Sequence, residues 1–586
     1  MDGLVKTTEK REVEEEFSFR KLFIPLTTLK AIHWIVLVGV MVYAIMLFNP
    51  AVWDDNEYLL NNSTLQTINI PAYFGVNIFN NSGQYRPLTV SYFGVLYAIF
   101  GSNLFFYHVI QLVLHITNAI LLFLLFKIFF NKKLSLFLSL LFLVHPMQVE
   151  SVSYISATDS TLFFLFGLIA LLIGVTKELN FRKIVIQQIL LFASILVKET
   201  GILFFLLILF YQFIFKKKYF VISLILSCIS VLLYFSIRIY IGNVTLVNRP
   251  LIPITRITVA ERLLTIPQVI FYYIKTFFYP VTLGINQQWV VTSPSVSTFY
   301  VPLFFDVLFF SLLCVFGYRI FKKNKKVITV YIFFSAWFLL GLGIHSQLVA
   351  LDMTVADRWA YFSLAGLLGV IGVILQHHFF SFGKYQNKIV ISIAVLIIFL
   401  LAARTVVRNI EWQNPINLWN GAIAVNDNFL SEDQLASAYV YADKLDKAVN
   451  PAEKSVLLFP NDNNLYNLGY IYEQLGNIQQ AKKEYRLAYQ AKNYIPWQHQ
   501  HYLQVYEQLA ILSLRTNDQK TAKDVLLAGV KDYPGTPELW YLLTICEYKL
   551  GDQKSAINAA QKALLLSPND AKMKDMYQKL LNNQPR

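Results

Sequence analysis

Residues 30–57 read KAIHWIVLVGVMVYAIMLFNPAVWDDNE, an apolar run that ends in a cluster of acidic residues. A helix needs about 20 consecutive apolar residues to cross a bilayer, and this run is long enough. Asp54, Asp55 and Glu57 follow it immediately. Carboxylates at a bilayer boundary indicate either a solvated loop that stops the helix from sliding into lipid, or a site that meets water, a cation or a substrate. Both interpretations stay open from this stretch alone.

The composition predicts a polytopic membrane protein. The chain has 586 residues, of which 56% are hydrophobic and 16% aromatic, more than a soluble core needs. Apolar residues are concentrated before about residue 408, so a membrane domain precedes a soluble one. The net charge of +14 comes largely from Lys and Arg in short loops between apolar runs, where they determine topology. We therefore exclude nucleic acid as a partner.

Eleven apolar runs are suitable for spans, and each must be helical because lipid offers no partners to backbone polar groups. A further segment, 263–283, contains Pro267 and Pro280 and is expected to be re-entrant or interfacial. The predicted division is a cytoplasmic tail over 1–29, a membrane domain over 30–408, a linker over 409–430 and a soluble domain over 431–586. The eleven runs are 30–49, 104–126, 134–150, 154–175, 184–197, 200–215, 219–241, 302–320, 327–344, 359–376 and 388–403.

The basic loops predict the orientation. Eleven crossings place all six Lys/Arg clusters on one side, which should be cytoplasmic. The N-terminus is then cytoplasmic and the C-terminal domain extracytoplasmic. The Lys-, Ile- and Asn-rich composition favours a prokaryotic plasma membrane, with the endoplasmic reticulum as the alternative.

The C-terminal region carries the helix-turn-helix pattern of tetratricopeptide repeats (TPR). Ala522 and Pro534 recur as Ala556 and Pro568, with the period of about 34 residues typical of these repeats. We expect three to four repeats, and an all-α fold in which the membrane domain is followed by a solenoid. Such arrays either hold a partner or serve as scaffolds.

The predicted outer loops share an unusual set of ionisable residues. Each has a structural explanation by itself, such as a helix end or a self-neutralising turn. Together with Asp54 and Asp55 they place carboxylates beside several cations, the arrangement needed to hold a phosphate and to deprotonate a neighbouring group. The set comprises Arg86, His145, Glu150, Asp159, Lys198, Glu199, Asp357 and Arg358, with Arg249, Arg256 and Arg262 in the loop 242–262.

Six motifs in this order, ahead of C-terminal repeats, resemble a known family. It is that of the transmembrane and TPR-containing O-mannosyltransferases of the GT-C superfamily, and the resemblance covers roughly residues 30 to 586. The motifs are Trp53-Asp54-Asp55, Tyr85-Arg86-Pro87-Leu88-Thr89-Val90, Tyr107-His108…Asn118, His145-Pro146…Glu150, Lys198-Glu199-Thr200-Gly201 and Ala356-Asp357-Arg358…Tyr361. The chain departs from the family's motifs at two places. Where the family has Gly-Arg-Ala followed by an acidic residue, this chain has Ser156-Ala157-Thr158-Asp159. Where the family has Ala-Glu-Arg, this chain has Ala356-Asp357-Arg358.

The resemblance implies an inverting transfer of a monosaccharide, with mannose favoured, from a polyprenyl-phosphate donor to Ser/Thr hydroxyls of proteins on the extracytoplasmic face. Asp54 or Asp55 would be the general base, and Arg86, Lys198 and Arg358 would stabilise the leaving phosphate. The remaining expected substrate-binding residues are Glu57, His145, Glu150, Asp159, Glu199, Arg249 and Asp357. We expect no cofactor and no metal, although pyrophosphate-dependent members of the superfamily often hold a divalent cation.

The expected partners are the lipid-linked donor, an acceptor polypeptide held by the repeats, and the bilayer. Three other functions are alternatives. The acceptor could be a cell-envelope lipid or glycan, or the chain could be a non-catalytic membrane scaffold. A transporter is disfavoured because the sequence shows no paired internal repeats.

Overall fold

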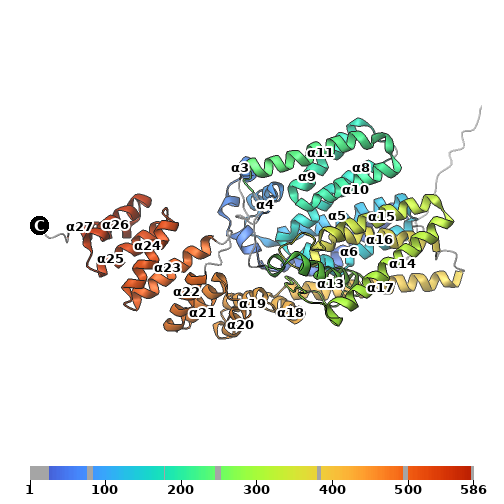
Figure 1. Ribbon diagram of the computed structural model, residues 1–586. Coiled ribbons are helices and arrows are strands. Elements are labelled where there is room, and N and C mark those ends of the chain that lie inside the picture. Colours follow the sequence, from blue (N-terminus) through green and yellow to red (C-terminus); the bar gives the residue numbers. More distant parts are fainter. Residues whose placement is uncertain are drawn as a thin grey trace, which may run out of the picture.

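A computed structural model describes residues 26–75, 83–176, 178–244, 252–378, 384–491 and 499–582. Figure 1 shows two parts: a bundle of long helices, and an elongated stack of short helices that extends from one end of the bundle. In the described residues, extended pairing is limited to one isolated bridge between Gln287 and Val355. The all-α fold predicted from the sequence is confirmed.

Eight helical segments of the described residues are long and apolar enough to cross a membrane, and a bent pair would make nine. The chain is therefore a multi-pass membrane protein. The eight are Thr28–Phe48, made of α2 (Thr28–Tyr43) and η1 (Ala44–Phe48); α5 (Leu104–Phe129); Ile155–Val175, made of η5 (Ile155–Ala157) and α8 (Thr158–Val175); α11 (Lys217–Tyr240); Val296–Lys323, made of η7 (Val296–Tyr300) and α14 (Val301–Lys323); α15 (Lys325–Ile344); Asp357–His377, made of η8 (Asp357–Trp359) and most of α16 (Ala360–His378); and Ile389–Trp412 within α17 (Lys384–Trp412).

The other three predicted spans are also helical but are bent or short. The run 134–150 is α6 (Lys132–Val144) followed, after a 50° bend, by η4 (Pro146–Gln148) and α7 (Val149–Ser153). The runs 184–197 and 200–215 are α9 (Phe181–Val197) and, after η6 (Glu199–Gly201), α10 (Ile202–Phe215). With 17 and 14 residues, neither reaches the length of about 20 that a perpendicular crossing needs. The number of crossings and the orientation stay predictions.

The segment expected to be re-entrant or interfacial is the helix α13 (Val259–Phe278). A capping box between Thr258 and Glu261 starts it, and Pro267 lies inside it. One face is buried and includes Val269 and Tyr273, while Leu263 is 52% exposed. This amphipathic pattern is typical of a helix that lies at a surface rather than inside a bundle. The remaining short elements of this domain are η2 (Asn56–Leu60), η3 (Ser63–Gln66), α3 (Ile70–Gly75), α4 (Pro87–Phe100) and α12 (Pro253–Arg256).

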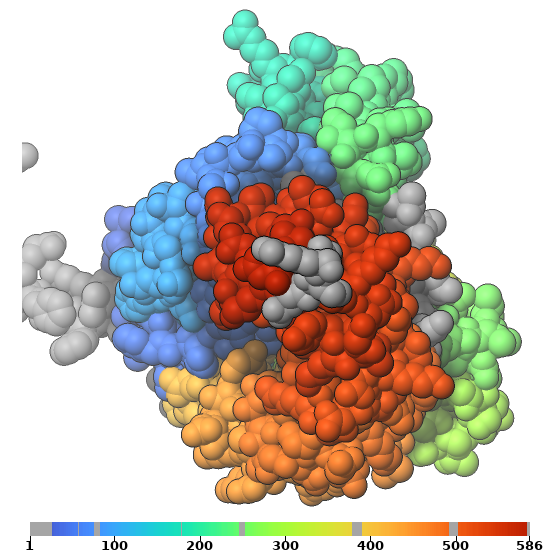
Figure 2. Space-filling view, turned by 90° about the vertical axis from the view of Figure 1, so that its left-hand side faces the viewer, coloured from blue at the N-terminus to red at the C-terminus, as the bar shows by residue number. Residues whose placement is uncertain are grey.

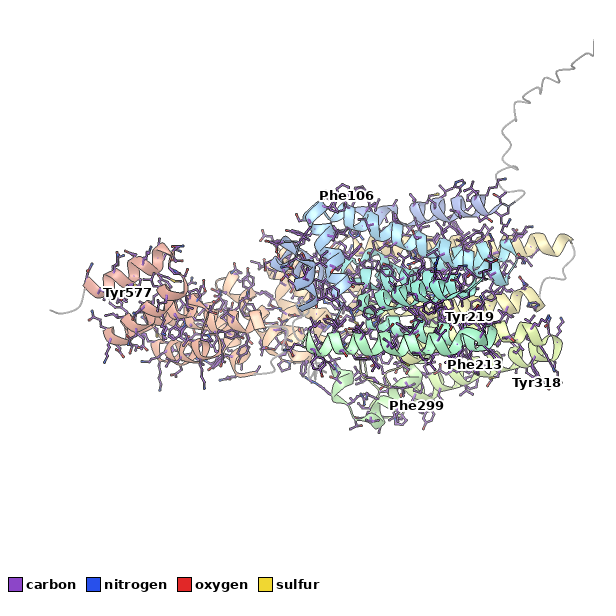
Figure 3. The ribbon with its side chains drawn as sticks, turned by 90° about the horizontal axis from the view of Figure 1, so that it is seen from above. Phe106, Phe213, Tyr219, Phe299, Tyr318 and Tyr577 are labelled. Carbon is purple, nitrogen blue, oxygen red and sulfur yellow. The ribbon has the colours of Figure 1, made fainter. Side chains whose placement is uncertain are left out.

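Close helix contact in the bundle depends on glycine. A Cβ atom at Gly366 of α16 would lie 2.4 Å from the backbone nitrogen of Phe338 in α15, so no larger residue fits there. Small residues allow this approach in membrane helices, where packing rather than water exclusion drives association. On the outside of the bundle the side chains are large and apolar: Figure 3 labels Phe106, Phe213 and Tyr318, which are 39%, 53% and 58% exposed.

The second part of the molecule is a solenoid of paired antiparallel helices. The alanines of the repeat pattern, Ala481, Ala522 and Ala556, are fully buried, which lets the helices of each pair approach. The helices are α18 (Pro415–Val425), α19 (Phe429–Tyr441), α20 (Leu445–Leu458), α21 (Asp462–Gln474), α22 (Ile478–Ala491), α23 (His499–Arg515), α24 (Gln519–Asp532), α25 (Pro537–Lys549), α26 (Gln553–Leu566) and α27 (Ala571–Asn582).

The segment 409–430, expected as a linker, is largely helical and joins the two parts. The last membrane helix α17 runs on to Trp412, and α18 begins at Pro415. Trp412 and Trp419 are buried and belong to the same apolar core as the membrane helices. Figure 2, which looks along the solenoid, shows it lying in front of one end of the membrane domain. This anchoring places the first repeats over the ends of the membrane helices.

Candidate active site

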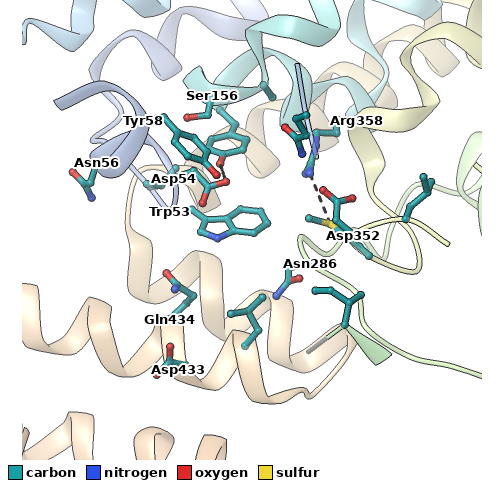
Figure 4. A pocket seen from close by; sticks show the side chains of 18 of the residues that line it. Trp53, Asp54, Asn56, Tyr58, Ser156, Asn286, Asp352, Arg358, Asp433 and Gln434 are labelled. Carbon is teal, nitrogen blue, oxygen red and sulfur yellow. Dashed lines mark hydrogen bonds between the residues drawn. The ribbon is translucent and has the colours of Figure 1, made fainter. Parts of the chain in front are cut away.

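A cavity of about 1380 Å³ lies between one end of the membrane bundle and the first helices of the solenoid. Ligand pockets of about 300–1,000 Å³ hold single small molecules, so this one has room for more than one small ligand. The membrane domain contributes Asp54, Arg86, Asp159, Lys198, Glu199, Arg238, Asn286, Asp352 and Arg358 to the lining. The solenoid contributes residues of α18, α19 and α21, and Figure 4 shows Asp433 and Gln434 opposite Asp54.

Asp54 and Asp55 follow a tight turn after the first membrane helix. The backbone N–H of Asp55 donates to the carbonyl of Val52 at 3.1 Å, and Trp53 within the turn has φ 52°. This left-handed conformation is uncommon for a residue with a bulky side chain. The two neighbouring carboxylates reach different surroundings after this turn, and their chemistry differs accordingly.

Asp54 faces the cavity. It is half-buried, and its Oδ2 accepts a hydrogen bond of 2.8 Å from the hydroxyl of Tyr154. The Tyr154 ring stacks on Trp53 with centroids 5.7 Å apart, which fixes the position of the hydroxyl. A carboxylate held this way at the edge of a cavity can accept a proton from a group that enters it.

Asp55 is buried behind the lining and holds the loop together. Its Oδ1 accepts hydrogen bonds from the backbone N–H of Ser156 at 2.8 Å and the hydroxyl of Ser156 at 2.6 Å. Its Oδ2 accepts from the backbone N–H of Val52 at 3.2 Å. Burial, and to a smaller extent the nearby charge of Asp54, raises the pKa of Asp55 to about 7 despite these bonds. Asp55 thus anchors the loop that carries Asp54.

Arg86, Asp159, Lys198 and Glu199 form one ion-pair network on the lining. Arg86 Nη1 lies 2.5 Å from Asp159 Oδ2, and Arg86 Nε lies 2.9 Å from Glu199 Oε2. Lys198 Nζ lies 3.1 Å from Asp159 Oδ1 and donates to the hydroxyl of Ser160 at 2.8 Å. Guanidinium and ammonium groups carry five and three N–H donors, and this network holds those of Arg86 and Lys198 in fixed positions on the cavity wall.

Arg358 is the second cationic element. It forms a charged hydrogen bond with Glu150, and its backbone N–H donates to the other oxygen of that carboxylate at 3.0 Å. Among the described residues, the hydrogen-bond partner of Arg358 Nη2 is a weak acceptor, the sulfur of Met353 at 3.8 Å, which an anionic ligand can displace. Glu150 is 1% exposed and does not line the cavity, so it orients Arg358 rather than contacting a ligand.

Two other predicted residues lie away from the cavity. His145 ends α6: its Nδ1 accepts from the backbone N–H of Met147 at 3.3 Å, and its Nε2 lies 3.1 Å from the carbonyl of Phe277. Asp357 is buried and accepts a hydrogen bond from the hydroxyl of Tyr272. Both residues stabilise the elements that carry the site. Glu57 lies in η2 beside the cavity, where only its backbone is described, and Arg249 lies outside the described residues.

The cavity also contains polar residues that the sequence analysis did not single out as site residues. Among them are Tyr154, Ser156, Arg238 and Asp352. Arg238 lies 3.7 Å from Glu199 Oε1 and donates to the carbonyl of Gly83 at 2.6 Å. A signal for Arg238 was present: it is a basic residue at the predicted outer end of a span, where positive charge is disfavoured. Ser156 occupies the stretch in which the chain departs from the resembled family.

The arrangement combines a base with an anion site in one cavity. In the described residues, no three His, Cys, Asp or Glu side chains are grouped so that they could hold a metal ion. The expectation that the site needs no metal stays a prediction. Asp54 can accept a proton, while Arg86, Lys198 and Arg358 can stabilise negative charge that develops nearby.

Comparison with known proteins finds relatives whose names agree with the resemblance described above. The tetratricopeptide repeat family matches residues 463–494. Protein O-mannosyl-transferase TMTC3 of Mus musculus is 22% identical over 92% of this chain and 64% of its own length. Protein O-mannosyl-transferase F38B6.6 of Caenorhabditis elegans is 29% identical over 28% of this chain and 25% of its own length. YrrB, a TPR protein with an unusual peptide-binding site, has a TM-score of 0.25 and 15% identity over 34% of this chain and 98% of its own.

The chain is thus a TMTC-like, TPR-containing protein, and the resemblance predicted from its motifs is confirmed. It spans less than two thirds of the mouse relative, 64% of that protein's length.

Proposed function

We propose that this protein is an inverting, GT-C-type O-glycosyltransferase of the membrane. It transfers one sugar, with mannose favoured by the relatives' names, from a polyprenyl-phosphate donor to Ser or Thr hydroxyls of a polypeptide. The observation that carries the proposal is the single cavity in which Asp54 lies with Arg86, Lys198 and Arg358. We place this cavity on the extracytoplasmic face, in a prokaryotic plasma membrane, with the N-terminus cytoplasmic.

Asp54 rather than Asp55 is the general base in this proposal. Asp54 lines the cavity, whereas the oxygens of Asp55 are occupied by Ser156 and Val52. Asp54 accepts the proton of the acceptor hydroxyl while the oxygen forms a bond to the anomeric carbon. The bond from that carbon to the phosphate oxygen breaks in the same step, through a transition state with oxocarbenium character.

The leaving group is a polyprenyl phosphate that gains one negative charge. Arg86, Lys198 and Arg358 stabilise this charge without reorganising, because Asp159, Glu199 and Glu150 already hold them in place. Such a leaving group needs no proton, so the proposal requires no general acid. It also requires no metal ion, since two or three cations neutralise one phosphate.

The test uses the purified chain in lipid nanodiscs with a panel of radiolabelled polyprenyl-phosphate sugars and a Ser/Thr-rich peptide. We expect label to reach the peptide from one donor, and Asp54→Asn to reduce this transfer at least about 100-fold. Asp524→Asn, at an exposed site on α24, is the matched control and should transfer at the wild-type rate. Absence of transfer from every donor, or transfer that survives Asp54→Asn, would contradict the proposal. If label reaches an envelope glycan but not the peptide, the acceptor is a glycan and not a polypeptide.

A further inference from the structure

The cavity extends beyond Asp54 to three asparagines that the proposed transfer does not use. Asn286 comes from the loop after α13 in the membrane domain, and Asn463 and Asn467 come from α21 of the solenoid. All three line the cavity, and we refer to them as the amide rim. Figure 4 shows Asn286 directed into the cavity, opposite the helix that carries Asp433 and Gln434.

Asn286 presents a buried donor to the cavity. The residue is fully buried and its Oδ1 accepts a hydrogen bond of 2.8 Å from Gln288 Nε2. Its carbonyl accepts from Asn428 Nδ2 at 3.2 Å, so the loop is tied to the solenoid. Among the described residues, Nδ2 of Asn286 finds no hydrogen-bond partner. Buried polar groups are nearly always satisfied, and a donor left over at a cavity wall therefore points to a ligand acceptor.

Asn463 and Asn467 present acceptors to the same cavity. Asn463 Nδ2 donates to Asp433 Oδ2 at 3.0 Å, and Asn467 Nδ2 lies 2.9 and 3.1 Å from the two oxygens of Asp433. Because both amide nitrogens face this one carboxylate, the amide oxygens are the atoms directed away from it. The two residues are four positions apart on α21, so they lie on the same face of the helix.

The spacing of these groups fits an extended main chain. Four residues of a helix rise about 6 Å. Two residues of an extended chain rise about 6.6 Å, after which the same edge of the backbone faces the same way again. Each peptide unit carries one N–H donor and one carbonyl acceptor. The rim offers the complementary pair, a donor on Asn286 and acceptors on Asn463 and Asn467.

We propose that the amide rim binds the main chain of the acceptor polypeptide in extended form, between the solenoid and the membrane domain. The inference rests on the proposed function, whose acceptor it identifies as an unfolded or extended segment rather than a lipid or a glycan. Asn286 donates to a peptide carbonyl, while Asn463 and Asn467 accept from peptide N–H groups. This places a Ser or Thr side chain of the same segment toward Asp54.

The experiment measures binding separately from transfer. The probe is a fluorescein-labelled peptide of alternating threonine and alanine, and its affinity for the full chain in nanodiscs is read from fluorescence anisotropy. Asn286→Asp keeps the shape and the Oδ1 acceptor but replaces the donor, and Asn463→Ala removes one of the three contacts to Asp433. We expect the dissociation constant to rise about 3- to 10-fold for each variant, the effect of one hydrogen bond. Asn558→Ala, at an exposed position of α26, should bind as the wild type does.

The outcomes separate the two proposals. If both rim variants bind the peptide with unchanged affinity and unfold thermally as the wild type does, the proposal that the rim binds the main chain is wrong. The rim proposal would also be overturned by an oligosaccharide that displaces the peptide, binds more tightly than the peptide does, and loses affinity in the same two variants. A wild-type chain that binds the peptide through the rim but transfers no sugar would instead overturn the proposed function. Weakened peptide binding with unchanged transfer to N-acetyl-threonine amide supports both.

Discussion

The two walls of the cavity differ in how they present polarity. The membrane wall carries full charges in fixed pairs, such as Arg358 with Glu150 and Lys198 with Asp159. The solenoid wall carries neutral amides around one buried carboxylate, Asp433, to which Asn463 and Asn467 donate. Preorganised charge stabilises a phosphate that gains negative charge, whereas amides match the donors and acceptors of a main chain. The difference indicates a division of roles between donor and acceptor.

Removing a cation from the membrane wall should have the largest effect. Arg358→Met keeps the length of the side chain but loses the donors that face the leaving phosphate. We expect kcat to fall about 100- to 1,000-fold, as for the loss of one donor that stabilises transition-state charge. Steady-state transfer assays measure this effect, with Arg319→Met at an exposed site of α14 as the control. If Arg358→Met keeps the wild-type kcat, Arg358 on the membrane wall does not stabilise the leaving phosphate.

Asp55, behind the membrane wall, should make the free energy of unfolding depend on pH. Burial raises the pKa of Asp55 to about 7 from 3.8, so the folded chain keeps a proton that the unfolded chain releases between these values. The free energy of unfolding therefore falls as pH rises from about 4 to about 7 and then levels off. Asp55→Asn does not titrate, so over this range it should gain roughly 2–4 kcal/mol relative to the wild type.

Thermal unfolding of both proteins in the same detergent across this pH range measures the difference. Parallel stability curves for Asp55→Asn and the wild type would show that Asp55 titrates normally. Burial also raises the pKa of Asp433, to about 6, so Asp433 titrates in the same pH range. Its contribution to stability is common to both proteins and cancels in their difference, which therefore reports on Asp55.

Tyr154 should matter for catalysis but not for ligand affinity. Tyr154→Phe keeps the ring between Trp53 and Trp412 and loses only the hydrogen bond to Asp54. A hydrogen bond to a charged group contributes about 1.5–3 kcal/mol, so we expect kcat to fall about 10- to 100-fold with an unchanged KM for peptide. If KM for the peptide changes and kcat does not, Tyr154 binds the acceptor and does not position the base.

On the solenoid side, Gly469→Ala should give the smallest effect and leave the membrane wall intact. A Cβ atom there would lie 2.7 Å from Cδ1 of Tyr485, so the α21–α22 pair must separate. The cost of overpacking, about 1–3 kcal/mol, is partly offset by the better helix propensity of alanine, about 1 kcal/mol. Limited proteolysis should cleave the solenoid sooner in Gly469→Ala, while donor binding stays at the wild-type level. Equal cleavage of both proteins would show that the pair tolerates the methyl group.

The sequence predicted the fold well because hydrophobic length and repeat period are local signals. The long apolar runs became helices, and the alanines of the repeat pattern are buried between paired helices. It could not separate Asp54 from Asp55, since their difference depends on the left-handed turn at Trp53 and on Ser156, which is about a hundred residues away in sequence. The helix α18 was missed for a similar reason: its burial depends on contact with the membrane core at Trp419.

The division of roles between the two walls can be measured directly by varying each substrate separately in two variants. Initial rates of sugar transfer in nanodiscs are fitted for the donor and for the peptide, in Lys198→Met on the membrane wall and Asn463→Ala on the solenoid wall. We predict that Lys198→Met raises the KM of the lipid-linked donor or lowers kcat with an unchanged KM for peptide. Asn463→Ala should raise the KM of the peptide alone. If both variants change the same constants by the same factor, the cavity does not separate donor from acceptor and this account is wrong.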